Sequence, residues 1–192
     1  MTFLSEPAPS SAQQQMYDED CAEDGFVWNN SRLWGHQPEL NERMSALIGE
    51  ASKAAKLTNR EKAMLVLGQA RAIGDSYCSL AWSRWLTEWE DADTALAAVR
   101  QDLTHFSPRE QALSAWARIV ATDPNGVTSG DVQPLRDVGF EDPQIHALTL
   151  YAALRMALST TNDALGAAPD RALADLLDPR VRDAVTWGRP PA

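Results

Sequence analysis

Helix start and stop signals follow one another along most of this 192-residue chain, and they constrain its fold more than any other feature. Thr58 with Glu61, and Ser107 with Glu110, have the spacing of a capping box, in which a hydroxyl and a carboxylate bond the free N–H groups of a helix start. Pro108 suits the first turn of the second of these helices. No segment alternates apolar and polar residues with the period of two that half-buried strands show. The sequence therefore predicts an all-α fold.

The same signals set the expected helix boundaries. Gly74 fits the end of the helix that starts at Thr58, and Asp75 or Ser76 can cap the next one. Gly166 fits the end of a long helix that starts at Pro143. We expect helices over residues 58–73, 75–90, 93–101, 107–121, 128–138 and 143–165, with two short helices opening at Pro169 and at Asp178-Pro179.

The chain divides into a tail and one domain. Residues 1–22 are rich in Ser, Pro and Gln and end in acidic residues, which predicts a flexible acidic N-terminal tail. Residues 23–192 are enough for a single helical domain with one core. The tail lacks the basic start and apolar run of a secretory signal, and no apolar run reaches the roughly 18 residues of a membrane span. A cytoplasmic protein is the expectation.

Composition excludes several classes of partner and cofactor. The net charge of −10, from 17 basic and 27 acidic residues, argues against binding to nucleic acid. His36, His105 and His146 have no partner at the spacing of a metal site, and no nucleotide-binding motif is present. We therefore expect no metal and no cofactor. Cys21 and Cys78 do not form a disulfide framework and are expected to be reduced.

The chain contains one internal echo. The stretches 57–61 and 106–110 share the pattern [Leu/Phe]-[Ser/Thr]-x-Arg-Glu, lie 49 residues apart, and each opens a helix. The echo indicates either two related helical halves or a chance recurrence of capping boxes. Seventeen residues after Glu61 lies Cys78, whereas Val127 occupies that place after Glu110, so only the first half carries a thiol.

The segment LTNREKAMLVLGQARAIGDSYCSLAW resembles the core of the alkylhydroperoxidase D/carboxymuconolactone decarboxylase superfamily, where such a helix leads through a glycine turn into C-x-x-C-x-x-x-H. The second half, with its Asp-Pro turn and its DVQPLRDVGF and DALG stretches, is similar to the peroxidase-related branch. The resemblance implies an AhpD-like all-α fold that assembles as a homo-oligomer (dimer, trimer or hexamer). It also implies an antioxidant oxidoreductase of peroxiredoxin type, which reduces a hydroperoxide and is restored by a thiol reductant.

This sequence departs from the family motif at its chemical positions. Asp75 stands where the first cysteine belongs, Cys78 takes the second cysteine position, and Trp82 replaces the histidine. The relay glutamate of the family falls at Ala63, and the nearby Glu61 is better explained by the capping box. A peroxidase cycle with two cysteines is therefore excluded, because Asp75 cannot form a disulfide and an indole N–H is only a donor.

Cys78 can still act alone. Its place in the first turn of a helix favours the thiolate, while Asp75 one turn earlier disfavours it, so the sequence leaves the direction of its pKa shift open. Cys78 is either a single peroxidatic thiol or a small buried residue that packs under Trp82. Cys21 is the one internal candidate for a resolving thiol, and the alternative is a solvent-facing bystander.

Trp82, Trp85 and Trp89 share one helical face. They form either a core or interface stripe or, at Trp82, the wall of an apolar pocket, and Arg84 beside them either steers an anionic ligand or is solvated. Two functions follow from these alternatives. The first is a peroxidase-related protein, at most a one-cysteine thiol peroxidase using Cys78. The second is an inactive oligomeric scaffold or ligand-binding protein that kept the fold and lost the C-x-x-C site.

Overall fold

The computed structural model describes residues 2–192, and every regular element within them is an α-helix. This confirms the all-α prediction. The helices of this range are α1 (Ser11–Asp24), α2 (Asn29–Trp34), α3 (Pro38–Ala54), α4 (Asn59–Ile73), α5 (Ser76–Trp89), α6 (Ala92–Arg100), α7 (Pro108–Thr122), α8 (Ser129–Asp137), α9 (Asp142–Ala164), α10 (Arg171–Leu176) and α11 (Pro179–Ala184). The predicted boundaries of α4, α5 and α9 are correct to within one residue at each end.

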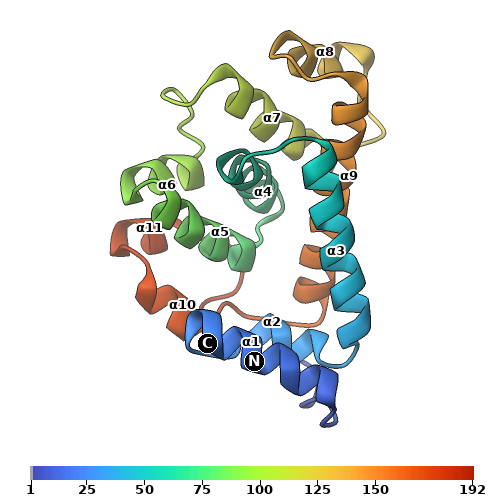
Figure 1. Ribbon diagram of the computed structural model, residues 1–192. Coiled ribbons are helices and arrows are strands. Elements are labelled where there is room, and N and C mark those ends of the chain that lie inside the picture. Colours follow the sequence, from blue (N-terminus) through green and yellow to red (C-terminus); the bar gives the residue numbers. More distant parts are fainter. Residues whose placement is uncertain (1) are drawn as a thin grey trace.

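Helix α4 is the central helix, and α5, α6, α7 and α9 pack around it (Figure 1). Residues 63–70 of α4 are all buried, which matches a sequence that is apolar on every side of the helix. The one long polar side chain there, Gln69, donates to the carbonyl oxygen of Ala152 in α9 at 2.9 Å. Helix α3 runs alongside α9, while α1, α2 and α10 gather at one end of the molecule and α8 lies at the other.

Both predicted capping boxes are present. The Thr58 hydroxyl accepts the N–H of Glu61 at 3.2 Å, and the Glu61 carboxylate accepts the N–H of Thr58 at 2.9 Å. Ser107 and Glu110 repeat this arrangement at the start of α7, with distances of 3.3 and 2.8 Å. Each glutamate therefore satisfies a backbone donor that a helix start otherwise leaves free.

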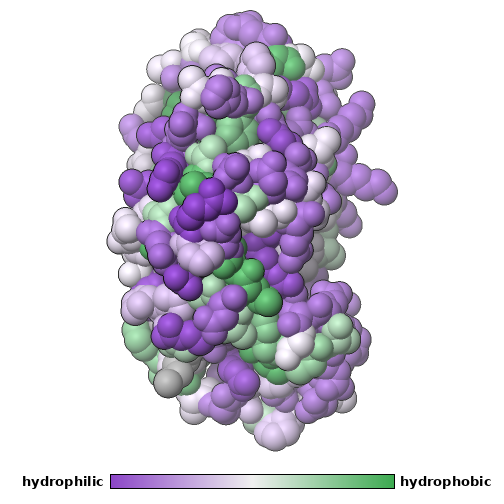
Figure 2. All heavy atoms as spheres, turned by 90° about the vertical axis from the view of Figure 1, so that its left-hand side faces the viewer, coloured by the Kyte–Doolittle hydropathy of each residue, from purple (hydrophilic) through white to green (hydrophobic). Residues whose placement is uncertain are grey.

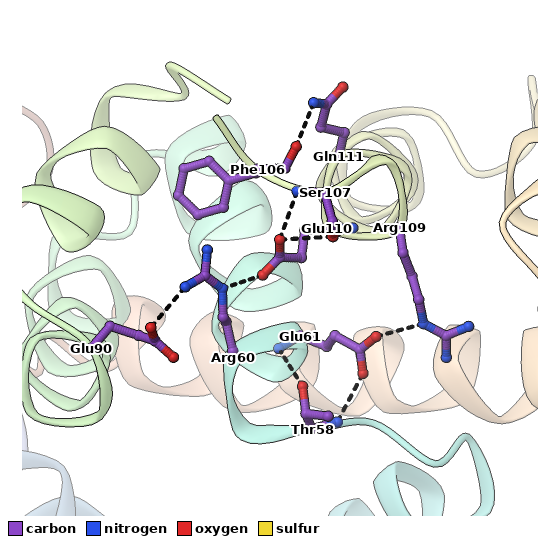
Figure 3. Close-up of polar contacts among 9 residues, drawn as sticks. All are labelled: Thr58, Arg60, Glu61, Glu90, Phe106, Ser107, Arg109, Glu110 and Gln111. Atoms are coloured by element: carbon purple, nitrogen blue, oxygen red, sulfur yellow. Dashed lines mark hydrogen bonds and ion pairs between the residues drawn. The ribbon is translucent and has the colours of Figure 1, made fainter. Parts of the chain in front are cut away.

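The two helix starts are also tied to each other by reciprocal ion pairs (Figure 3). Arg60 of α4 donates to Glu110 of α7, and Arg109 of α7 donates to Glu61 of α4 at 2.5 Å. Burial opposes ionisation of Glu110, but hydrogen bonds from Ser107 and Arg60 outweigh it and hold the pKa of Glu110 below its ordinary value. The 49-residue echo in the sequence thus corresponds to a reciprocal contact between two helices.

Helices α4 and α7 approach closely at Gly68. A Cβ atom at Gly68 would lie 2.7 Å from Oγ, 2.8 Å from the carbonyl oxygen and 3.2 Å from Cα of Ser114. Ser114 is fully buried and its hydroxyl donates to the side chain of Gln101 at 2.9 Å, so it cannot retreat towards solvent. The glycine is therefore required by the separation of the two helices rather than by its own backbone angles.

The N-terminal segment differs from the flexible tail predicted over residues 1–22, because its second half forms α1. The Ser10 hydroxyl caps this helix by accepting the N–H of Gln13 at 3.1 Å, and Gly25 ends it at φ +81°. Gln13 is the one buried residue of α1, so the helix has no apolar face. Hydrophobic periodicity, which would have supported a helix assignment from the sequence, is absent here for that reason, although Ser10 and Gly25 are start and stop signals.

None of the helices in residues 2–192 is long and apolar enough to cross a lipid bilayer. The face over α6, α10 and α11 is mostly hydrophilic, and its apolar residues follow one another in a band through the middle and lower part of the face (Figure 2).

The close approach of α4 and α7 predicts the effect of Gly68→Ala. The added Cβ meets the backbone of Ser114, so the helices must separate and the free energy of unfolding should fall by about 1–3 kcal/mol. Gly49→Ala is the matched control, because Gly49 is also inside a helix but a methyl group added there meets no neighbouring atom within 4 Å. That control should gain up to about 1 kcal/mol from helix propensity. Urea denaturation followed by circular dichroism measures both, and equal effects would contradict the account.

Candidate functional site

Cys78 lies in the first turn of α5, as predicted. Gly74 adopts φ +76° and ends α4, and Asp75 is the N-cap residue of α5. The Asp75 carboxylate accepts the backbone N–H of Cys78 at 2.8 Å. Asp75 therefore orders the turn that carries Cys78.

The Cys78 thiol is buried beside two polar groups of α9. The Ser159 hydroxyl lies 3.4 Å from Sγ, and Nη2 of Arg155 lies 3.9 Å from it. Burial, reinforced by the charge of Asp75, raises the pKa of Cys78 to about 12, although Arg155 and Ser159 act in the opposite direction. The direction that the sequence left open is therefore upward, and the thiol is protonated at neutral pH.

A pocket of about 270 Å³ opens beside Cys78 and is enclosed by residues of α1, α3, α5 and α9 together with the segment from Trp28 to Trp34. Aromatic side chains form much of its wall: Trp28, Trp34, Tyr77, Trp82 and Trp85. Asn30, Cys78 and Arg155 add polar groups to the same wall. Trp82 is therefore part of a pocket wall that combines aromatic and polar side chains.

The tryptophan face of α5 divides between this pocket and the surface. The Trp82 and Trp85 rings meet edge to face with their centroids 5.2 Å apart, and the Trp85 ring lies 6.1 Å from that of Trp28. Trp82 is buried, whereas Trp89 is 40% exposed. The two alternatives for this face were a core stripe and a pocket wall. Trp82 belongs to both, because it is buried in the core and also lines the pocket.

Three polar atoms of the pocket residues are buried without a hydrogen-bond partner among residues 2–192. They are Nε1 of Trp82, Nε of Arg155 and Oδ1 of Asn30. Two neighbouring indoles differ in this respect: the Trp28 N–H donates to Asp24 at 2.7 Å, and the Trp34 N–H donates to Asn162 at 2.9 Å. Because buried polar groups are normally paired, unpaired ones grouped at one pocket indicate a place for a ligand or for ordered water.

Helix α1 supplies the acidic edge of the pocket, namely Asp20, Glu23 and Asp24. Asp20 accepts the backbone N–H of Trp28 at 3.1 Å, so it also holds the N-cap residue of α2. Asp24 pairs with Arg84 at 2.7 Å. Neither alternative for Arg84 is correct, because it is neither solvated nor free to steer a ligand: it is 14% exposed and its charge is matched by Asp24 and by Glu88.

Sequence reasoning missed Arg155 and Ser159. They lie 77 and 81 residues after Cys78, and no local motif links them to it. One signal was available, because Arg155 is the single charged residue in the stretch ALTLYAALRMAL of α9. A charge within such an apolar run is expected to have a partner or a function.

The remaining candidate residues lie apart from the pocket. Cys21 is exposed on α1, and both cysteines are free. Nε2 of His36 lies 3.0 Å from the carbonyl oxygen of Ser5, a contact that connects two loops. Glu61 is occupied by its capping box and by Arg109. Within residues 2–192, no three His, Cys, Asp or Glu side chains are grouped in a way that would hold a metal ion.

Comparison with solved structures identifies the fold. The chain is similar over its full length to 98% of the AhpD core of an uncharacterized peroxidase-related protein from Ralstonia eutropha JMP134, with a TM-score of 0.74 and 20% identity. It is also similar to the debrominase Bmp8, both in its apo form (TM-score 0.75, 17% identity, 95% of this chain and 97% of that one) and as a variant in complex with 2,3,4-tribromopyrrole (TM-score 0.73, 18% identity, 92% and 97%). Neither a protein-family model nor a curated protein matches the sequence. The predicted AhpD-like fold is confirmed.

The raised pKa of Cys78 predicts how the two thiols react with iodoacetamide. Because the pKa of Cys78 lies well above 8, little of its thiol is ionised at pH 8, so Cys21 should be alkylated and Cys78 should not. In a Cys21→Ser protein, alkylation of Cys78 should rise with pH to above pH 9. Asp75→Asn keeps a good N-cap but removes a negative charge, so it should lower the pKa of Cys78 and increase the rate. Alkylation of native Cys78 as fast as Cys21 at pH 7 would contradict the assignment.

Proposed function

We propose that this protein binds a small planar organic molecule in the pocket beside Cys78, with the thiol as part of the wall. The observation that carries the proposal is the wall itself, in which five aromatic residues line one space and three polar atoms of the lining residues are buried without a partner. Aromatic faces and edges favour a flat ligand, and unpaired donors and acceptors can orient it. This is the ligand-binding alternative of the sequence analysis.

The size of the pocket supports a ligand with one ring. A volume of about 270 Å³ is just below the range of roughly 300–1,000 Å³ that is typical of drug-sized ligands. The similarity to Bmp8 agrees with this size, because a variant of that debrominase was crystallised with 2,3,4-tribromopyrrole, a single flat ring. The fold is thus compatible with a small planar ligand.

A one-cysteine thiol peroxidase is the second candidate. Its support is that Cys78 lines the pocket with Arg155 at 3.9 Å, and that one structural neighbour is described as peroxidase-related. In this reaction the thiolate attacks the peroxide, the O–O bond breaks, and sulfenic acid and an alcohol form. Two external thiols then restore the cysteine and release water and a disulfide. We rank this candidate second, because the high pKa of Cys78 leaves little thiolate to attack a peroxide.

Binding of neutral planar compounds tests the first candidate. Benzamide and benzyl alcohol should bind to the reduced protein, as measured by calorimetry and by quenching of tryptophan fluorescence. Ala81→Leu should weaken binding, because Ala81 lines the pocket and the larger side chain fills part of it. Ala157→Leu is the matched control, since it makes the same change at an exposed site of α9 outside the pocket. The proposal fails if no such compound binds or if the two variants behave alike.

We also propose a homo-oligomer, which the resemblance implies. Exposed leucines support an apolar contact: Leu40 and Leu47 of α3 are 53% and 42% exposed, and Leu150 of α9 is 38% exposed. Light scattering at micromolar concentration should give a mass that is a multiple of 21.1 kDa. A single species of 21.1 kDa would exclude the oligomer.

A further inference from the structure

Arg155 carries a charge that nothing in residues 2–192 neutralises. It is half-buried, no carboxylate oxygen lies within 4 Å of its guanidinium, and its Nε has no hydrogen-bond partner. Its guanidinium carbon lies 5.0 Å from the centre of the Trp82 ring, and its Nη2 lies 3.9 Å from Sγ of Cys78. By contrast Arg84, the arginine nearest in sequence to the tryptophan face, is paired with Asp24 and Glu88.

Nε of Arg155 and Nε1 of Trp82 both lack a hydrogen-bond acceptor. A guanidinium and an indole N–H are donors only, so each needs an acceptor. Arg155 also needs a negative charge, because a charge partly removed from water is costly unless it is paired. Both side chains belong to the wall of one pocket and lie against each other, so a single bound group can serve both.

We propose that the ligand of this pocket is a planar aromatic monocarboxylate, with its carboxylate bound by Arg155 and Trp82 and its ring against the aromatic wall. This inference rests on the proposed function and names the chemical class of its ligand. Arginine binds carboxylates with two parallel hydrogen bonds, which also sets the orientation of the ring. Trp28 and Trp85, whose ring centroids lie 6.1 Å apart, are among the aromatic residues that line the pocket.

The acidic edge of the pocket restricts the ligand to one negative charge. Asp20, Glu23 and Asp24 of α1 all line the pocket on the side of the N-terminal helix. Asp24 forms an ion pair with Arg84, and Asp20 accepts a backbone N–H. Both are carboxylates, so neither attracts an anion. A second carboxylate on the ligand would meet these groups, so a dianion should bind more weakly than a monoanion.

Calorimetry with four matched probes tests the inference on the full-length reduced protein. The probes are benzoate, the neutral isostere benzamide, the non-planar acid cyclohexanecarboxylate and the dianion terephthalate. Benzoate should bind most tightly. Arg155→Gln should weaken the binding of benzoate at least about tenfold and leave the binding of benzamide unchanged, as expected for the loss of a charge-assisted hydrogen bond. Arg155→Lys should retain part of the affinity, and Arg118→Gln, at an exposed arginine of α7, should retain all of it.

The outcomes separate this inference from the proposed function. If benzamide binds as tightly as benzoate and Arg155→Gln changes neither, the carboxylate assignment is overturned while the pocket still binds a planar ring. If cyclohexanecarboxylate binds as tightly as benzoate, the inference that the ligand is planar and aromatic is overturned. If no probe binds to the native protein, the proposed function itself fails. Circular dichroism melting of each variant shows whether it is folded. If Arg155→Gln is not folded, Arg155→Lys takes its place in the comparison of benzoate with benzamide.

Discussion

The contact between α4 and α7 determines where the candidate site lies. At Gly68 the two helices are too close to leave room for a Cβ atom, and at their starts Arg60 and Arg109 each bind the capping glutamate of the other helix. Helix α4 continues through the turn at Gly74 into α5. The position of Cys78 is therefore set by the packing of α4, and the pocket forms where α5 meets α9 and the N-terminal helices.

The same local structure explains why the pKa of the Cys78 thiol is raised. Asp75 satisfies a free N–H of α5 and so holds Cys78 in place, but its charge opposes a thiolate one turn away. Burial acts in the same direction and is the larger effect. In a site of this kind the distinctive groups are the donors around the thiol, because Nε1 of Trp82 and Nε of Arg155 have no acceptor within residues 2–192. That is why a binding function accounts for more of the geometry than a redox function does.

Local features of the fold were predictable, and long-range ones were not. The capping boxes at Thr58 and Ser107 and the cap at Asp75 depend on residues three apart, so the sequence was sufficient to predict them. Helix α1 escaped prediction because it packs without an apolar face. Arg155 escaped because its relation to Cys78 spans 77 residues and arises only when α9 packs beside α5.

The indole N–H signals of the seven tryptophans in a ¹H–¹⁵N NMR spectrum provide the most direct test of the pocket assignment. The Trp82 signal, assigned with Trp82→Phe, should shift most when benzoate is added, because its N–H gains an acceptor. The Trp116 signal should stay in place, since that N–H already donates to Thr149 at 3.0 Å and lies outside the pocket. A shift at Trp116 with no change at Trp82 would show that the ligand binds elsewhere and would contradict the account.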